Sequence, residues 1–252
     1  MIELDQLHKQ FASRDGSPSV IALDNVSIHQ KKGEFLAVMG PSGCGKTTLL
    51  NIIAGFESVN SGTCKVAGQF VNSTGPDRGV VFQEYALFPW MTVERNVTFA
   101  MQAAEKWTEG SAVRAREILD RMGLSNFRNA FPKNLSGGMR QRVAIARILA
   151  IDSPVMLMDE PFGALDALTR GVLQEELMHL WRETNKTIFF ITHSADEAIY
   201  LADRVLVMTP RPGKVVLEME IELDRPRDPT SPEFNGYKKA ILDVINPSLK
   251  SL

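Results

Sequence analysis

Residues 40–48 read Gly40-Pro41-Ser42-Gly43-Cys44-Gly45-Lys46-Thr47-Thr48, a glycine followed after four residues by Gly-Lys-Thr. An apolar run of strand length, residues 35–39, precedes this stretch, and residues 49–54 continue it as the start of a buried helix. A strand, a glycine-rich loop and a helix in this order predict a phosphate-binding P-loop. The alternative is a glycine-rich turn that only joins a strand to a helix.

The residue types in this loop suit an anion. Glycines let the backbone curl so that successive N–H groups point at phosphate oxygens, and the helix that follows directs its dipole at the same charge. We expect Lys46 to reach the β- and γ-phosphates, Thr47 to offer its hydroxyl to Mg²⁺, and Thr48 to lie close to the α-phosphate. The loop therefore predicts ATP and Mg²⁺ as ligands.

Length and composition indicate an ordinary globular chain. Its 252 residues are 44% hydrophobic and 23% charged, with a net charge of −2. This favours one large domain or a core with an inserted subdomain. Because a basic surplus is absent, composition gives no support for a nucleic-acid partner.

Neither the hydropathy nor the cysteine content indicates export. No apolar run approaches the roughly 20 residues that span a bilayer, and the N-terminus lacks the basic and apolar regions of a secretion signal. We therefore expect the chain to stay in the cytosol and to meet membranes through partners.

Cys44 and Cys64 do not suggest a disulfide framework. Cys44, beside an anion site, is either unusually reactive or a small filler residue.

The apolar pattern predicts the secondary structure. Alternation predicts strands over residues 1–38, interrupted by a polar loop at 13–19, and a hairpin at 63–71. Residues 84–150 lose the strand signals, and 93–104 and 111–122 have helical spacing. Further strands are expected at 155–158, 187–192, 204–208 and 214–217, with a last short helix at 234–245. A helix at 164–182 is expected to bury the stripe Leu165, Leu168, Val172, Leu173, Leu177 and Leu180.

Polar residues follow three of these buried strands. Gln83 ends the strand at 79–82, Asp159 and Glu160 end the strand at 155–158, and His193 ends the strand at 187–192. Open α/β sheets place ligand groups at the carboxyl ends of their strands. Asp159 can hold Mg²⁺, Glu160 can orient or deprotonate an attacking water, and His193 can contact a γ-phosphate. The alternatives are a surface loop at Gln83, an acid pair at 159–160 that is only solvated, and a structural role for His193.

Two further features have a plain and a functional interpretation. Ser136 can cap the helix at 139–150, and Gly137 and Gly138 leave its first N–H groups uncovered, which is either a second anion site or an ordinary helix start. Phe11 either stacks on an adenine ring or is a strand core residue, and spacing alone favours the core.

Taken together, these motifs resemble the nucleotide-binding subunit of ABC transporters over residues 1 to about 217. The family's motifs occur here in its order: Walker A at 40–48, the Q-loop at Gln83, the signature at 135–142, Walker B at 155–160, the D-loop at 163–166 and the switch histidine at His193. Phe11 stands where the family keeps its adenine-stacking aromatic. One departure is Met139, which replaces the glutamine that most often ends the signature.

The resemblance implies a fold and a site. The fold is α/β, a P-loop NTPase core with a mainly parallel sheet and an antiparallel N-terminal β-subdomain. An ATPase domain at 1–217 carries an inserted α-helical subdomain at about 84–150, and 218–252 form a tail. The implied catalytic residues are Glu160, His193 and Gln83. The implied Mg²⁺ ligands are Thr47, Gln83 and Asp159. The implied ATP ligands are Phe11, Gly40, Pro41, Ser42, Gly43, Cys44, Gly45, Lys46, Thr47, Thr48, Gln83, Asp159 and His193.

The resemblance also implies partners. Two copies enclose two ATP molecules, each of which meets Ser136, Gly137, Gly138 and Asp166 of the opposite copy. Residues 87–90, 160–170 and 211–214 resemble the importer branch for nitrate, sulfonate, taurine and bicarbonate. Such an ATPase lies at the cytoplasmic face of the plasma membrane with two membrane-spanning permease subunits, and indirectly with a substrate-binding protein.

The region after Gln83 is the expected contact with those permeases. Residues 83–90 are expected to form a groove, because an apolar cluster such as Leu87, Phe88 and Trp90 is otherwise unfavourable on a soluble surface. Alternatively, these side chains pack within the helical subdomain.

Two other functions stay open, a non-transport ABC ATPase acting on nucleic acid or ribosomes and the ATPase of an exporter. The transported solute is not encoded in these motifs.

Overall fold

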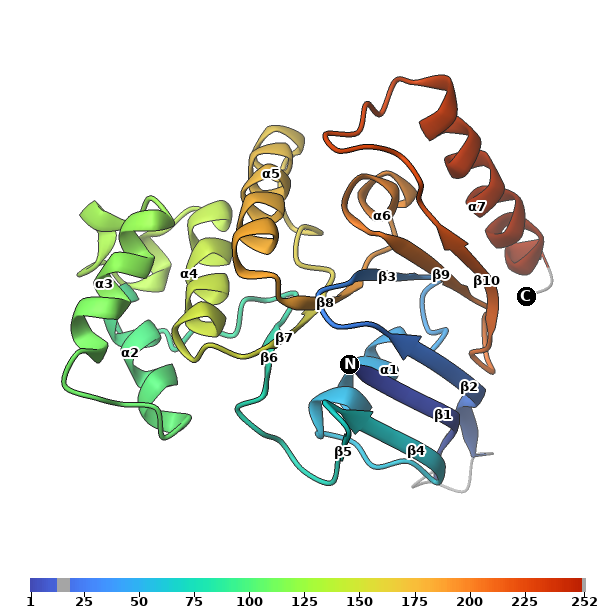
Figure 1. Ribbon diagram of the computed structural model, residues 1–252, viewed down its shortest axis with the longest axis horizontal. Helices are drawn as coiled ribbons and strands as arrows, with labels where there is room; N and C mark the ends of the chain where they lie inside the picture. The colour runs from blue at the N-terminus through green and yellow to red at the C-terminus, as the bar shows by residue number, and fades with distance from the viewer. Residues whose placement is uncertain (13–18, 251–252) are drawn as a thin grey trace. The chain divides into compact units, whose positions relative to one another are not determined.

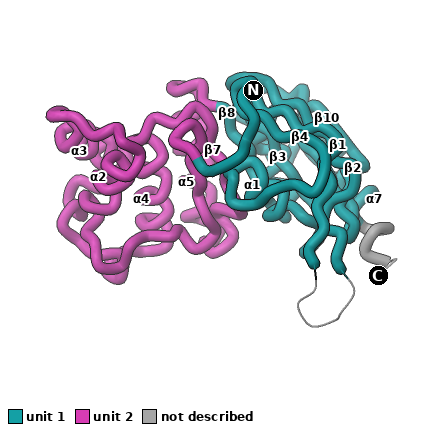
Figure 2. The backbone as a smooth tube through the Cα atoms, turned by 90° about the horizontal axis from the view of Figure 1, so that it is seen from below, with its two compact units in different colours: residues 1–74, 187–252 teal, residues 75–186 magenta. Residues whose placement is uncertain are grey.

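The computed structural model describes residues 1–12 and 19–250, so all but the last residue of the loop expected at 13–19 lies outside the described part. The chain divides into two compact units, residues 1–74 with 187–252 (unit 1) and residues 75–186 (unit 2), which Figure 2 colours separately. The apolar pattern predicts most of the strands and helices in each unit.

Unit 1 begins with an antiparallel sheet of order β2-β1-β4-β5. Its strands are β1 (Ile2–Phe11), β2 (Val20–Gln30), β4 (Ser61–Val66) and β5 (Gln69–Phe70). The expected hairpin at 63–71 is confirmed, and its two turn residues, Ala67 and Gly68, both have positive φ angles of 51° and 80°. Such a turn matches the right-handed twist of the strands that it joins.

The remaining strands of unit 1 form a second, mixed group, β10-β9-β3-β8. They are β3 (Phe35–Met39), β8 (Thr187–Ile191), β9 (Arg204–Met208) and β10 (Val215–Glu220). The central strand β3 pairs in parallel with both β8 and β9, whereas β10 is antiparallel to β9 (Figure 1). Every residue of β3 and β8 is buried, as continuous apolar strands in parallel sheets usually are.

Three helices complete unit 1: α1 (Lys46–Ala54), α6 (Ala195–Leu201) and α7 (Pro232–Lys250). Helix α7 contacts α6, β9 and β10. It begins two residues before, and ends five residues after, the short helix expected at 234–245. The amphipathic pattern therefore located this helix correctly but underestimated its length.

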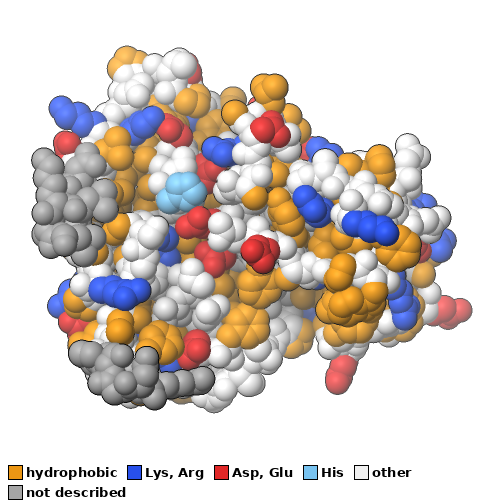
Figure 3. All heavy atoms as spheres, turned by 180° about the vertical axis from the view of Figure 1, so that it is seen from behind, with side chains coloured by type: hydrophobic (Ala, Val, Ile, Leu, Met, Phe, Trp, Pro, Cys, Tyr) orange, Lys and Arg blue, Asp and Glu red, His pale blue; other side chains and the backbone are white. Residues whose placement is uncertain are grey.

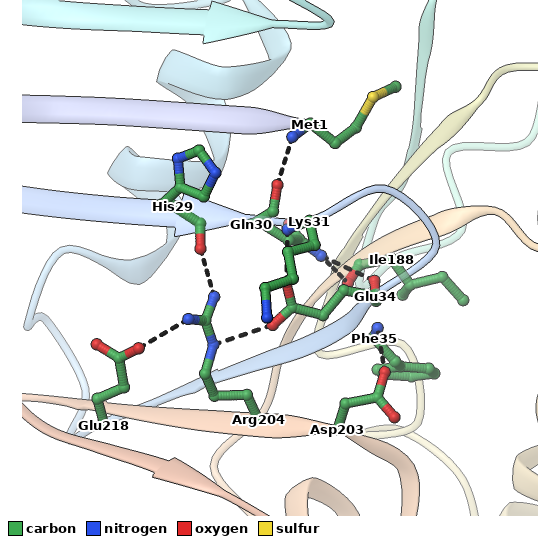
Figure 4. Close-up of polar contacts among 10 residues, drawn as sticks. All are labelled: Met1, His29, Gln30, Lys31, Glu34, Phe35, Ile188, Asp203, Arg204 and Glu218. Carbon is green, nitrogen blue, oxygen red and sulfur yellow. Dashed lines mark hydrogen bonds and ion pairs between the residues drawn. The ribbon is translucent and has the colours of Figure 1, made fainter.

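A polar network fixes the start of the P-loop strand, as Figure 4 shows. Arg204 at the beginning of β9 lies 2.9 Å from Glu34 and 2.7 Å from Glu218, and it also donates to the carbonyl oxygen of His29. Asp203 accepts a hydrogen bond of 2.8 Å from the backbone N–H of Phe35, the first residue of β3. The side chain of Gln30 donates to the carbonyl oxygens of Glu34 and Ile188. These contacts join the antiparallel sheet to β3, β8, β9 and β10.

Unit 2 combines a parallel strand pair with helices. Strands β6 (Arg78–Val81) and β7 (Val155–Asp159) pair in parallel, and helices α2 (Val93–Ala103), α3 (Ser111–Arg121) and α4 (Gly137–Ala150) contact one another. Two short 3₁₀ turns, η1 (Ser125–Phe127) and η2 (Pro132–Asn134), precede α4, and α5 (Ala167–Thr184) follows β7. The helical character expected after residue 84 is confirmed, and the antiparallel sheet and parallel pairs agree with the predicted fold class.

The apolar stripe expected on the helix at 164–182 is partly wrong. Leu173 and Leu177 are buried on α5, and Leu165 is buried just before it, but Leu168 is 86% exposed and Val172 is 50% exposed. Leu180 is half-buried. The first turns of α5 therefore present two apolar side chains, Leu168 and Val172, to solvent.

None of the helices in residues 1–12 and 19–250 combines the length and apolarity needed to cross a bilayer. Both cysteines are buried, and they do not form a disulfide with each other.

Candidate nucleotide site

The loop between β3 and α1 has an exposed, uncapped helix start. Gly45 precedes α1 in a left-handed conformation, no side chain caps the helix, and its first turn holds no acidic residue. A side chain at Gly45 is excluded, since a Cβ there would lie 2.7 Å from the carbonyl oxygen of Ala22. The first N–H groups of α1 are therefore available to an anion, as in other phosphate sites at helix N-termini.

Lys46 brings a cation to the same place. Its buried ammonium group donates to the carbonyl oxygens of Gly40 at 2.8 Å and Pro41 at 3.1 Å, so that it lies against the loop. Thr47 is exposed beside it. A buried ammonium, uncovered N–H groups and an exposed hydroxyl fit a phosphate chain with a magnesium ion, which prefers oxygen ligands.

Cys44 is a packing residue in this arrangement. Burial raises the pKa of its thiol, and the nearby Lys46 ammonium opposes that shift. Since the thiolate is the reactive form, a raised pKa disfavours the reactive interpretation of Cys44. The structure supports the small filler residue.

A second loop, which motif spacing did not assign to the site, packs against the P-loop. The side chain of Arg211 donates to the carbonyl oxygen of Gly43 at 3.1 Å. A Cβ on Gly213 would lie 2.1 Å from the carbonyl oxygen of Cys44, so this position requires glycine. The string at 211–214, noted above only for its resemblance to importers, therefore supports the shape of the P-loop.

His193 lies at the same sheet edge as the P-loop. In the parallel pairing of β3 with β8, Val38 is opposite Ile191, so both strands end together. His193 is exposed, and the following Ser194 caps α6 by accepting from the backbone N–H of Glu197. The buried Glu197 carboxylate accepts a hydrogen bond of 2.5 Å from the hydroxyl of Thr192. No motif or spacing predicts this contact between Thr192 and Glu197, which fixes the turn that carries His193.

Phe11 is not the core residue that strand spacing favours. It ends β1 with 38% of its surface exposed, and the ammonium group of Lys9 lies 4.9 Å from its ring centroid. That interpretation is wrong. An exposed aromatic ring is compatible with stacking on adenine, which stays a prediction.

Unit 2 brings together the polar residues that follow its two strands. Val81 of β6 is opposite Met158 of β7, so Gln83 and the pair Asp159 and Glu160 follow strand ends at one edge. The Gln83 amide nitrogen lies 3.8 Å from the position that a Cβ on Gly163 would occupy. Their roles toward Mg²⁺ and water remain predictions, and in the described part of the chain no three His, Cys, Asp or Glu side chains cluster as a metal site.

The signature helix starts as predicted. Ser136 is the N-cap of α4, and its hydroxyl oxygen accepts from the backbone N–H of Met139 at 3.3 Å. A Cβ on Gly138 would lie 2.7 Å from the methyl group of Thr169, so glycine permits the start of α5 to approach. Asp166 caps α5 through the N–H of Thr169 at 3.0 Å, and these hydrogen bonds lower the pKa of its carboxyl group.

A hollow of about 340 Å³ lies between these two helix starts. Its lining consists of Ser136, Gly138, Met139, Arg142, Leu168, Thr169 and Val172. The replacement of glutamine by Met139 therefore adds an apolar side chain to this hollow. Ser136, which also lines the hollow, is exposed to solvent.

The aromatic segment after Gln83 is partly exposed. Trp90 is 70% exposed and packs on Phe88, whose ring also contacts Phe99 at a centroid distance of 5.1 Å. The buried Asn96 holds this segment by bonding both the N–H and the carbonyl oxygen of Phe88, and the carbonyl oxygens of residues 91 and 92. Phe88 therefore packs within the helical region, whereas Trp90 faces solvent, and the groove for a permease helix stays a prediction.

Comparison with known proteins decides the family. The family model described as ABC transporter matches residues 23–163. The chain belongs to the ABC transporter family. It is an ABC transporter ATPase, in which ATP hydrolysis is coupled to transport, and the resemblance inferred from its motifs is confirmed.

Several relatives cover most of this ABC ATPase. An uncharacterised ABC transporter ATP-binding protein of Methanocaldococcus jannaschii is 52% identical over 234 residues, which are 92% of this chain and 88% of that protein. A nitrate import ATP-binding protein of Synechocystis is 46% identical, covering 94% and 88%. An aliphatic sulfonates import ATP-binding protein of Bacillus cereus is 41% identical, covering 96% and 94%.

Solved structures of the family agree with the fold. A dimeric ATP-binding cassette in a post-hydrolysis state, bound to ADP and Pi, superposes with a TM-score of 0.77 at 33% identity and covers 89% of this chain and all of that one. A second dimeric ABC transporter cassette gives a TM-score of 0.78 at 34% identity, again over 89% of this chain.

Proposed function

We propose that this ABC ATPase powers the import of a small solute of the nitrate, sulfonate, taurine or bicarbonate class. The observation that carries the proposal is the P-loop, where Lys46 and the uncapped start of α1 offer positive charge at one sheet edge with His193. The nitrate and sulfonate importers among its relatives support the solute class. The ATPase works with two permease subunits and a substrate-binding protein at the cytoplasmic face of the plasma membrane.

The working form is a homodimer. Lys46 and the first N–H groups of α1 bind the β- and γ-phosphates of one ATP, and Phe11 stacks on its adenine. Ser136, Gly137 and Gly138 of the second copy approach the γ-phosphate, where the start of their helix stabilises negative charge. Asp166 of that copy completes the contact. The dimeric structures of similar cassettes support this arrangement.

Hydrolysis depends on side chains that follow three strands. Glu160 orients and deprotonates the attacking water, and His193 contacts the γ-phosphate. Thr47, Gln83 and Asp159 would hold Mg²⁺, which when bound neutralises charge on the phosphate oxygens. Loss of the γ-phosphate removes the charge that holds the two copies together, so the dimer opens and drives the permease.

Residues 83–90 dock the permease. Trp90 offers an exposed aromatic surface in the segment after Gln83, and Asn96 fixes the backbone of the nearby Phe88. An aromatic side chain in the groove that residues 83–90 form can pack against a partner's helix and anchor the contact. We expect a cytosolic helix of the permease to bind there.

The test is ATP hydrolysis by the purified chain. We expect Mg²⁺-dependent phosphate release that Glu160→Gln nearly abolishes, because the water loses its base. The same variant should elute as a dimer in gel filtration with ATP and as a monomer without it. Phosphate release near the wild-type rate, or a monomer with ATP, would contradict the role of Glu160.

The two other functions predict different partners. A nucleic-acid or ribosome ATPase should bind RNA or DNA, yet lysine and arginine side chains are interspersed with acidic ones on the face in Figure 3, and the net charge is −2. Co-purification with a multi-span membrane protein would separate transport from that function. Dependence of transport on a solute-binding protein would separate import from export.

A further inference from the structure

The turn that carries Gln83 holds an unusual backbone. The N–H of Tyr85 donates to the carbonyl oxygen of Phe82 at 3.0 Å, and the N–H of Ala86 donates to that of Glu84 at 2.7 Å. Tyr85 and Ala86 have φ angles of 63° and 46°, the left-handed region that residues with a Cβ rarely adopt. Two such residues in succession persist only where neighbouring groups hold them.

The signature helix supplies those groups. The guanidinium of Arg147 in α4 donates to the carbonyl oxygen of Ala86 at 2.6 Å and to that of Tyr85 at 3.0 Å. Burial lowers the pKa of Arg147, as expected for a cation largely withdrawn from water. A charged donor to two carbonyl oxygens makes hydrogen bonds stronger than neutral ones.

The same helix also holds the side chain of Tyr85. The guanidinium carbon of Arg140 lies 5.5 Å from its ring centroid, within the range of cation–π attraction. The hydroxyl of Tyr85 lies 3.4 Å from the position of a Cβ on Gly137. Positions 137, 140 and 147 share one face of a helix with 3.6 residues per turn. Tyr85 is therefore held along α4 from its first residue to its last turn.

This contact joins two motifs of the site. Gln83 lies two residues before Tyr85, and Ser136 caps the helix that carries Arg147. The whole contact lies inside unit 2. A displacement of the Gln83 turn therefore requires α4 to move or its hydrogen bonds to break.

We propose that Arg147 is a positioning residue, which fixes the Gln83 turn to the signature helix so that Gln83 and Ser136 move as one body. The proposal rests on the proposed ATPase function, because it assigns Gln83 to Mg²⁺ and Ser136 to the opposite ATP. Without Arg147, the turn relaxes from its left-handed conformation and Gln83 loses its place beside the strand ends. We therefore expect the loss of Arg147 to impair Mg²⁺-dependent hydrolysis in a chain that still folds.

The experiment measures the Mg²⁺ concentration for half-maximal ATPase activity of the purified chain. Arg147→Gln should raise it about tenfold, the size of effect typical for residues that orient metal ligands. The matched control is Arg121→Gln, on an arginine of unit 2 that is 73% exposed and pairs with Glu183 at 3.4 Å. The control should match the wild type.

A double-mutant cycle separates positioning from general destabilisation. Gln83→Ala should raise the Mg²⁺ requirement by itself, and Arg147→Gln should add nothing further in that background, because the residue that it positions is gone. Additive effects of the two changes would overturn the proposal. An active Arg147→Gln variant with the same Mg²⁺ requirement as the Arg121→Gln control would also overturn it.

Arg147→Lys covers the case in which Arg147→Gln does not fold. A lysine keeps the charge but lacks the planar fork that reaches two carbonyl oxygens. We expect an intermediate Mg²⁺ requirement, and a value equal to the wild type would overturn the proposal. A folded wild-type chain without Mg²⁺-dependent hydrolysis would instead overturn the proposed function, and the role of Gln83 with it.

Discussion

Arg227 carries the largest predicted effect on stability. It lies after β10, is only 4% exposed, and donates to the backbone carbonyl oxygens of Ile199, Ala202, Ile221 and Leu223. Two of these carbonyls belong to the end of α6, the helix that follows His193. Arg227 thus fastens the segment before α7 to the helix that follows the switch histidine.

The magnitude follows from these bonds. Four hydrogen bonds from a charged donor, at about 1.5 kcal/mol each, contribute about 6 kcal/mol. Burial opposes the charge and lowers the pKa of Arg227 to about 10, and this desolvation offsets about 3 kcal/mol of that gain. We therefore expect Arg227→Met, which keeps the apolar stem, to lower the free energy of unfolding by about 3 kcal/mol.

Urea denaturation followed by circular dichroism measures this change. The control is Lys239→Met on the exposed side of α7, which should stay within about 0.5 kcal/mol of the wild type. Arg227→Lys should recover part of the loss, since an ammonium group donates three bonds at most. If Arg227→Met unfolds at the same urea concentration as the control, the four carbonyl contacts do not stabilise the fold as argued.

Three other predictions concern single side chains. Lys46→Ala should weaken ATP binding by tenfold or more, because the loop loses its cation; an unchanged affinity in equilibrium dialysis would contradict the assigned role. Asn96→Leu should lower the free energy of unfolding by about 2 kcal/mol, because buried carbonyl groups lose their donor; urea denaturation tests this, and a change below about 0.5 kcal/mol would be evidence against it. Burial raises the pKa of the Cys44 thiol, so its thiolate fraction at neutral pH lies below that of a free cysteine. A thiol reagent should therefore label Cys44 quickly only in urea. Rapid labelling of Cys44 in the native chain would argue against a packing role.

Much of the fold was predictable from local pattern. Continuous apolar runs identified β3, β7 and β8, and the types and spacing of the polar residues identified the P-loop in unit 1 and the acidic strand end in unit 2. These signals are strong because burial and phosphate binding restrict residue type at each position. The cap at Ser136 was predictable for the same reason.

Two predictions that failed, and one contact that was missed, also have physical causes. Alternation along β1 is broken by register shifts between Leu4 and Gln10, where Gln6 has a φ of 48°, so Phe11 does not face the core that simple alternation assigns to it. Leu168 fits a helical stripe, but periodicity does not show which turns of a helix are covered by neighbouring elements. The contact of Arg147 with Tyr85 joins residues 62 positions apart, and no local spacing encodes it.

The cap of the signature helix restricts which amino acids suit position 136. The Ser136 oxygen accepts from Met139, and its own proton remains to be given outward, since a hydroxyl both accepts and donates. Aspartate caps helices as well as serine does, yet under the proposed function it would set a negative charge against the nucleotide of the opposite copy. A library of variants selected for folding alone should therefore keep Asp at this position, whereas one selected for growth on the imported nutrient should discard it.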